Sequence, residues 1–288
     1  MKKAFVIMLL TLCLVVLPAL SLAADTAPET LIICNDMVSH DKYYVANASG
    51  GLSEVSTKPA SGYLYYNKET GVLTLNNISL TAGNAVYGIR ISDSQYPDGR
   101  YGKLTINVVG TNAITGTGSA GSIYLDKINC TISGSGTLSV TCANMSAMQV
   151  RSLTVSDPVT LNLTANGSAL AKAIESTNDI SFSNGTITAK APNGEGIGIV
   201  SVAGNISISG NAKVDTDGKS YGLSCGGDHK GNNGKLTISG GQLTASGADV
   251  ETVWAQEIDV SGGKVNITRD SALSGLSANK LVKAEMPM

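Results

Sequence analysis

A short phrase of alternating apolar and polar residues returns seven times along the chain, and this repeat limits the fold more than any other feature. Its first apolar position falls at residues 104, 130, 153, 180, 206, 236 and 258, which gives spacings from 22 to 30 residues and a mean of about 26. A repeat of that length suits one turn of a three-sided solenoid and is too short for a propeller blade.

Each phrase has the period-two pattern of a strand with one buried face, as in Leu236–Ile238. A Gly, Asn or Asp follows it, and a second strand such as Leu243–Ala245 begins. These corner residues tolerate the positive φ or tight bend that a turn of chain needs. A third strand, such as Ile123–Leu125, completes the coil. The pattern predicts an all-β fold: a single-stranded parallel β-helix, that is, a three-sided solenoid of roughly seven coils.

The outward middle residue of the repeated phrase is a hydroxyl residue in six of the seven coils, and the seventh is an aspartate. Such a column provides solubility and hydrogen bonds between neighbouring strands. Its members are Thr105, Thr131, Thr154, Ser181, Ser207, Thr237 and Asp259.

The ends of the chain lack the repeat, and a solenoid needs covers over its edge strands. We predict a signal peptide over residues 1–23, an N-terminal cap region over 24–62, the solenoid over 63–270 and a C-terminal cap or tail over 271–288. Within this scheme, residues 63–76 have the pattern of a β-hairpin with a turn at 68–71.

The first 23 residues have the three parts of a secretory signal peptide. Lys2 and Lys3 precede the apolar run Ala4–Leu17, and small residues lead to a cleavage site that we place after Ala23. We therefore expect a secreted protein, extracellular or associated with the cell surface. No second run long enough to span a bilayer follows, so no transmembrane segment is expected in the mature chain.

Charge and cysteine content exclude several classes of function. Without Lys2 and Lys3, 18 of the 20 basic residues stand against 22 acidic ones, and no basic stripe is present. Nucleic-acid binding depends on clustered Lys and Arg, so we exclude it.

Cys130 and Cys142 occupy positions that are apolar in neighbouring repeats, and we interpret them as small buried hydrophobes instead of a disulfide pair. No cysteine spacing is typical of a metal site, and no metal or cofactor is predicted.

The phrases "LYYNKETGVLTLNN", "GKLTINVVGTNAIT" and "GKLTISGGQLTASG" resemble a group of secreted bacterial right-handed β-helix proteins. Those proteins have tandem GxLTIsG coils and often a carbohydrate-binding-domain label, and they are mostly uncharacterised. The resemblance covers roughly residues 60–268. It implies a β-helix that contacts extracellular glycans, but it carries over no catalytic residues, because the shared positions are core and corner positions.

Glycan-binding surfaces present aromatic rings to sugar C–H groups, with amides and carboxylates nearby. In the loop 92–102, Tyr96 and Tyr101 flank Asp98, and these three residues are the predicted glycan site. We expect a second tyrosine group, Tyr63, Tyr65 and Tyr66, to pack in the cap hairpin with one face buried.

No cluster of residues identifies a reaction. Asp259 is the one carboxylate in the hydroxyl column, whereas glycoside hydrolysis needs two. We therefore expect a non-enzymatic binding or adhesion module for an extracellular polysaccharide or a host or cell-surface glycan. Two alternatives stay open: a structural or protein-interaction scaffold, and a polysaccharide lyase or hydrolase.

Overall fold

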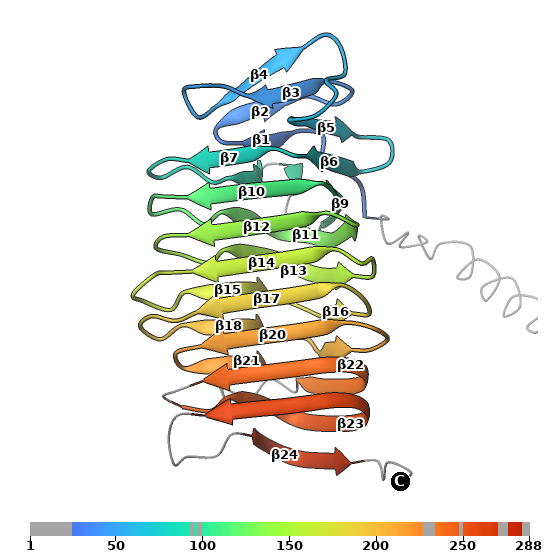
Figure 1. Cartoon of the computed structure of the whole chain (residues 1–288), viewed down its shortest axis with the longest axis vertical. Helices are drawn as coiled ribbons and strands as arrows, with labels where there is room; N and C mark the ends of the chain where they lie inside the picture. The colour runs from blue at the N-terminus through green and yellow to red at the C-terminus, as the bar shows by residue number, and fades with distance from the viewer. Residues whose placement is uncertain are drawn as a thin grey trace, which may run out of the picture.

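A computed structural model describes residues 25–92, 95–96, 100–226, 234–247, 250–269 and 276–283. Within these ranges the chain is all-β, with 24 strands and no helix (Figure 1). The strands form a parallel β-solenoid of about six turns, which confirms the predicted fold class. No helix in the described part of the chain is long and apolar enough to cross a membrane.

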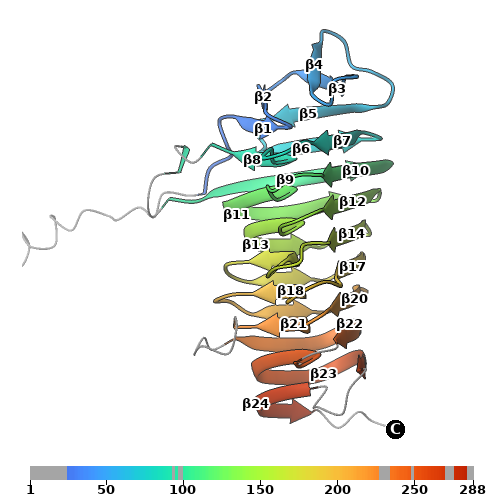
Figure 2. The ribbon, with the colours of Figure 1, turned by 90° about the vertical axis from the view of Figure 1, so that its left-hand side faces the viewer.

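Each coil contributes one strand to each of three faces (Figures 1 and 2). The hydroxyl face carries the repeated phrase, in β6 (Val72–Asn76), β9 (Gly102–Val109), β16 (Ile180–Phe182), β19 (Ile206–Ile208) and parts of longer strands. The second face comprises β7 (Ser79–Ala82), β10 (Thr111–Gly116), β12 (Thr137–Cys142), β14 (Thr160–Ala165), β17 (Thr186–Ala191) and β20 (Lys213–Gly218). The third, which we call the tyrosine face, includes β8 (Ile89–Ile91), β15 (Lys172–Ser176), β18 (Ile197–Ser201) and β21 (Tyr221–Cys225).

Some strands bend around a corner and serve two or three faces. These are β11 (Ile123–Gly134), β13 (Met148–Val155), β22 (Lys235–Gly247), β23 (Val253–Arg269) and β24 (Leu276–Lys283). In β11, for example, Ile123–Leu125 lies on the tyrosine face, and the register shifts before the strand continues from Asn129 on the hydroxyl face.

The coils stack in register, so equivalent apolar residues lie on top of one another inside the solenoid. Ile206 pairs with Ile180 on one side and with Leu236 on the other, and all three are at most 1% exposed. The whole hydroxyl column, from Thr105 to Asp259, pairs coil by coil as the sequence predicts. Stability therefore comes from contacts between neighbouring coils.

Glycines with positive φ occupy the corners between the first and second strands, as the sequence predicts. Gly134, Gly185, Gly210, Gly241 and Gly263 all have φ between 56° and 97°. At Gly134 a Cβ atom would also lie only 2.3 Å from the Val108 carbonyl oxygen of the preceding coil. The corner needs both the left-handed conformation and the missing side chain.

Antiparallel strands form the N-terminal end of the stack (Figure 1). β1 (Leu31–Ile33) pairs with β2 (Asp36–Val38) and β8, and β3 (Tyr43–Ala46) pairs with β4 (Leu52–Val55) and β5 (Tyr63–Asn67). β5 and β6 are antiparallel partners joined at residues 68–71, which confirms the predicted hairpin. The predicted signal peptide lies outside the described residues.

The four cysteines beyond residue 24 are free and buried. Cys130 and Cys142 are at most 1% exposed, which confirms their interpretation as small buried hydrophobes. Burial raises the pKa of the Cys130 thiol to about 12. These thiols pack in the core as small apolar groups.

Candidate functional site

An aromatic side chain projects outward from the tyrosine face at the second coil. Tyr124 lies between Ile123 and Leu125, which are fully buried, so the strand alternation directs the tyrosine away from the core. It is the register partner of Arg90 in β8 and of Gln149 in β13. Three successive coils thus bring a cation, an aromatic ring and an amide into one column.

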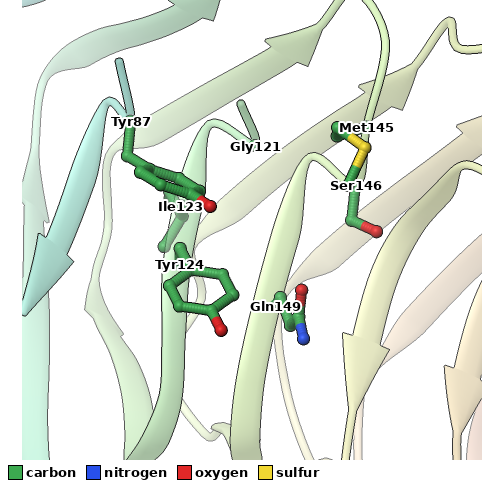
Figure 3. Close-up of a pocket in the computed structure, with 7 residues that line it drawn as sticks. All are labelled: Tyr87, Gly121, Ile123, Tyr124, Met145, Ser146 and Gln149. Carbon is green, nitrogen blue, oxygen red and sulfur yellow. The ribbon is translucent and has the colours of Figure 1, made fainter. Parts of the chain in front are cut away.

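A second tyrosine, from the coil before, contacts the first. The rings of Tyr87 and Tyr124 have centroids 4.9 Å apart and are tilted by 35° (Figure 3). Both side chains are partly exposed. Tyr87 lies just before β8 and Tyr124 lies in β11, so the pair exists only because the two coils stack.

Polar groups lie beside the ring pair. Gln149 is the register partner of Glu175, whose carboxylate pairs with Lys172 at 2.9 Å. The Ser146 hydroxyl donates a hydrogen bond to the other Glu175 oxygen at 3.1 Å. The Glu175 carboxylate is thus held in place by a cation and a hydroxyl, while the Gln149 amide lies between it and the rings.

The ring pair, Gln149 and their neighbours enclose a small notch, lined also by Gly121, Met145 and Ser146 (Figure 3). Its volume is about 30 Å³. A pocket that encloses a small molecule usually measures several hundred Å³, so this notch holds no more than one substituent of a ligand. The site is therefore suited to a ligand that lies along the surface.

The aromatic and polar groups of this cluster match the apolar and hydroxyl groups of a sugar. A tyrosine ring accepts the apolar C–H face of a pyranose, and amide and hydroxyl groups bond its hydroxyls. The half-exposed Met145 adds apolar surface at the edge. We call Tyr87, Tyr124, Ser146, Gln149 and Glu175 the tyrosine site.

Of the three residues of the predicted glycan site, the structure describes Tyr96 and Tyr101. Tyr96 is 4% exposed, its hydroxyl donates a hydrogen bond to the Thr26 carbonyl at 2.8 Å, and burial raises its pKa. A ring in that position offers no face to a ligand. The expectation that Tyr96 and Tyr101 are both exposed is therefore wrong for Tyr96. Asp98 lies outside the described residues.

Tyr101 is 39% exposed, but one face of its ring is occupied. The Arg151 guanidinium lies 3.7 Å from the ring centroid, and Nη1 of Arg151 also donates to the Asn129 side chain. A stacked arginine stabilises an exposed tyrosine by a cation–π interaction and shields that face from a sugar.

The cap tyrosines are divided between the interior and the surface. Tyr63 and Tyr66 are at most 5% exposed, whereas Tyr65 is partly exposed and stacks on Tyr43 with centroids 4.7 Å apart. The Tyr65 hydroxyl donates to Asp41. The hairpin therefore has one buried face, as expected.

A wider depression lies at the glycine corner of the later coils, with a volume of about 400 Å³. Its lining combines the corner residues Gly210, Gly241 and Gly263 with Lys213, Gln242 and Lys264. No aromatic ring lines it, so it lacks the apolar surface that the tyrosine site provides for a sugar.

The hydroxyl face carries two neighbouring carboxylates, where the sequence suggested one. Lys235 lies 2.9 Å from Glu257 and 3.0 Å from Asp259, and its pKa is raised by its hydrogen bonds to Glu257 and then to Asp259. Both carboxylates thus bond one ammonium group. Among the described residues, no three His, Cys, Asp or Glu side chains are grouped closely enough to hold a metal ion.

The sequence analysis missed Tyr87 and Tyr124 as site residues. A signal for Tyr124 was present, because it occupies the polar position of the alternating phrase Ile123–Leu125. Their contact was hidden because a full coil, with β8, β9 and β10, separates the two residues in the sequence. The chain matches no protein-family model, no curated protein and no solved structure.

Proposed function

We propose that this chain is a non-enzymatic glycan-binding module, secreted or associated with the cell surface. The observation that carries the proposal is the ring pair Tyr87 and Tyr124, partly exposed on the solenoid with Gln149 beside it. Adjacent aromatic and amide groups on a surface suit a sugar better than they suit a protein core.

Two features of the sequence support the same proposal. The N-terminal segment has the pattern of a secretory signal peptide, and glycans are abundant outside cells. The tandem GxLTIsG phrases resemble bacterial β-helix proteins that often carry a carbohydrate-binding label. The tyrosine site takes the place of Tyr96, Asp98 and Tyr101 as the proposed glycan-binding surface.

The charges near the site favour binding over catalysis. Glu175 pairs with Lys172 and accepts a hydrogen bond from Ser146, an arrangement that fixes a carboxylate as an acceptor. A glycosidase needs a second carboxyl group that is free to donate a proton across the bond. On the hydroxyl face, the carboxylates of Glu257 and Asp259 share Lys235.

A test uses the full secreted chain on insoluble cellulose, chitin, xylan, mannan and polygalacturonate, with retention and soluble products measured together. We expect retention on at least one polysaccharide without new reducing ends or unsaturated products. Tyr124→Ala is expected to lower that affinity at least about fivefold, because a lost aromatic platform typically costs about 1 kcal/mol or more.

Tyr101→Ala is the matched control, since it removes an exposed ring from the neighbouring corner and leaves the tyrosine site intact. Equal losses in both variants would move the site away from Tyr124. Released products would replace the binding module with an enzyme, and failure to bind any of the polysaccharides would favour a scaffold.

A further inference from the structure

The outward column that contains Tyr124 continues along the whole tyrosine face. Each coil contributes one position, and successive positions are register partners. Strands in a sheet lie about 4.8 Å apart, so Tyr124 and the fifth position beyond it are about 24 Å apart. The column reads Arg90, Tyr124, Gln149, Glu175, Val200, Ser224 and Trp254.

Aromatic residues return at the far end of this column. Trp254 is partly exposed in β23, where Val253 and Ala255 on either side are fully buried and so place it on the outer surface. Tyr221, at the start of β21, is also partly exposed. Between the two aromatic ends, Gln149 and Glu175 supply polar groups.

The exposure of the residues in this column changes along the solenoid. Val200 and Ser224 occupy outward register positions but are only 3% and 1% exposed. A ligand near these coils would therefore touch the larger Tyr221 and Trp254 side chains instead of Val200 and Ser224. The accessible groups thus divide into the tyrosine site, with its polar Gln149 and Glu175, and a second aromatic group, Tyr221 and Trp254.

A regular column of this kind favours a regular ligand. In an extended polysaccharide, the length of one sugar unit is comparable with the rise of one coil, so successive units lie over successive coils and the two aromatic ends are reached together. A branched or terminal sugar would use the tyrosine site alone. A linear chain parallel to the solenoid axis would use both aromatic ends.

We propose that the ligand is an extended linear polysaccharide that lies along the solenoid axis on the tyrosine face, about one sugar unit per coil, from Tyr87 and Tyr124 to Tyr221 and Trp254. This inference rests on the proposed glycan-binding function and adds the ligand's orientation, its minimum length and a second contact. Binding then requires about six units for full affinity.

Ligand contact at the far end of the column can be measured through the emission of Trp254, because it is the one tryptophan of the chain. The experiment titrates the full secreted chain with oligosaccharides of about two to eight units, prepared from whichever polysaccharide of the panel retains it. We expect affinity to rise at least about tenfold between about three and six units and then to level off. The tryptophan emission should change only with the longer oligosaccharides.

Trp254→Ala is expected to reduce the affinity for six units to that for three, while the affinity for three units stays as in the wild type. Thr237→Ala, on the hydroxyl face of the preceding coil, is the control, and unfolding midpoints show that each variant is folded. Because the emission is recorded on the wild-type chain, the test does not depend on a variant that folds.

An affinity that is flat beyond three units, with unchanged tryptophan emission, would overturn the axial arrangement and leave the tyrosine site as a short binding site. In that case Tyr124→Ala would still weaken binding. If no polysaccharide retains the chain, the glycan-binding function is wrong, and the axial arrangement falls with it.

Discussion

The Tyr96 hydroxyl donates a hydrogen bond to the carbonyl of Thr26, a residue 70 positions earlier, at a distance of 2.8 Å. This bond ties the loop before β9 to the first described residues of the chain. Tyr96→Phe removes the donor, while the Thr26 carbonyl keeps the hydrogen bond from the Lys103 N–H, so we expect a loss of about 0.5–1.5 kcal/mol in the free energy of unfolding. Denaturant unfolding measures it.

The same variant separates a structural tyrosine from a binding one. Tyr96→Phe should bind glycans as the wild type does, and Tyr101→Phe, at an exposed ring, should change stability by no more than about 0.5 kcal/mol. Equal stability of the Tyr96 variant and the wild type would show that the bond to Thr26 contributes nothing.

Ile206 packs between two coils, so its truncation should weaken both contacts. Ile206→Ala removes buried methyl groups that face Ile180 and Leu236, and we expect a cost of about 2–5 kcal/mol. Ser207→Ala changes the adjacent outward position and should cost less than about 0.5 kcal/mol. Urea midpoints of the two variants give the comparison; similar values would contradict a core that depends on stacked coils.

The corner glycine Gly134 should tolerate no side chain. Its φ is +97°, and a Cβ atom there would lie 2.3 Å from a backbone oxygen of the preceding coil. Gly134→Ala should therefore destabilise the chain by more than about 1 kcal/mol. At Gly83 a Cβ atom would meet nothing within 4 Å, so Gly83→Ala should be close to neutral in the same unfolding experiment. A neutral Gly134 variant would mean that the corner rearranges at low cost.

Alkaline pH should destabilise the fold partly through its buried thiols. The pKa of Cys130 rises from an ordinary 9.0 to about 12 on burial, and the pKa of Cys225 rises likewise to about 12. Between pH 9 and 12 the unfolded thiol loses its proton while the folded one keeps it. The folded state then binds more protons, and stability falls as pH rises, by at most about 1.4 kcal/mol per pH unit for each thiol.

Cys130→Ala isolates this contribution. The variant lacks one thiol that titrates on unfolding, so its stability should fall less steeply above pH 9 than that of the wild type. Unfolding midpoints at several pH values between 8 and 11 give the two slopes. Parallel slopes would show that Cys130 ionises with the same pKa in the folded and unfolded chains.

The coils could be predicted from the sequence because their information is local and repeated. The alternation at Thr131 or Ser207 places a hydroxyl outside and its neighbours inside, and the Gly, Asn or Asp after each phrase marks the corner. Once the period is known, the register follows, since every coil aligns the same positions.

The site could not be predicted in the same way, because it depends on contacts between loops and coils of unequal length. Tyr96 is buried and hydrogen-bonded to a residue 70 positions away, and no local pattern distinguishes it from the more exposed Tyr101. Tyr87 contacts Tyr124 although a full coil, with β8, β9 and β10, lies between them in the sequence. Hydrophobicity alone assigns a tyrosine to neither the core nor the surface.

Because each coil pairs with the coils directly before and after it, the chain should also respond to mechanical force in a characteristic way. Tension applied at the C-terminal end would peel off one coil at a time, and each event would release about 26 residues, or about 90 Å of extended chain. A stretched molecule would therefore lengthen in nearly equal steps, so that it yields to tension gradually while its remaining coils stay folded.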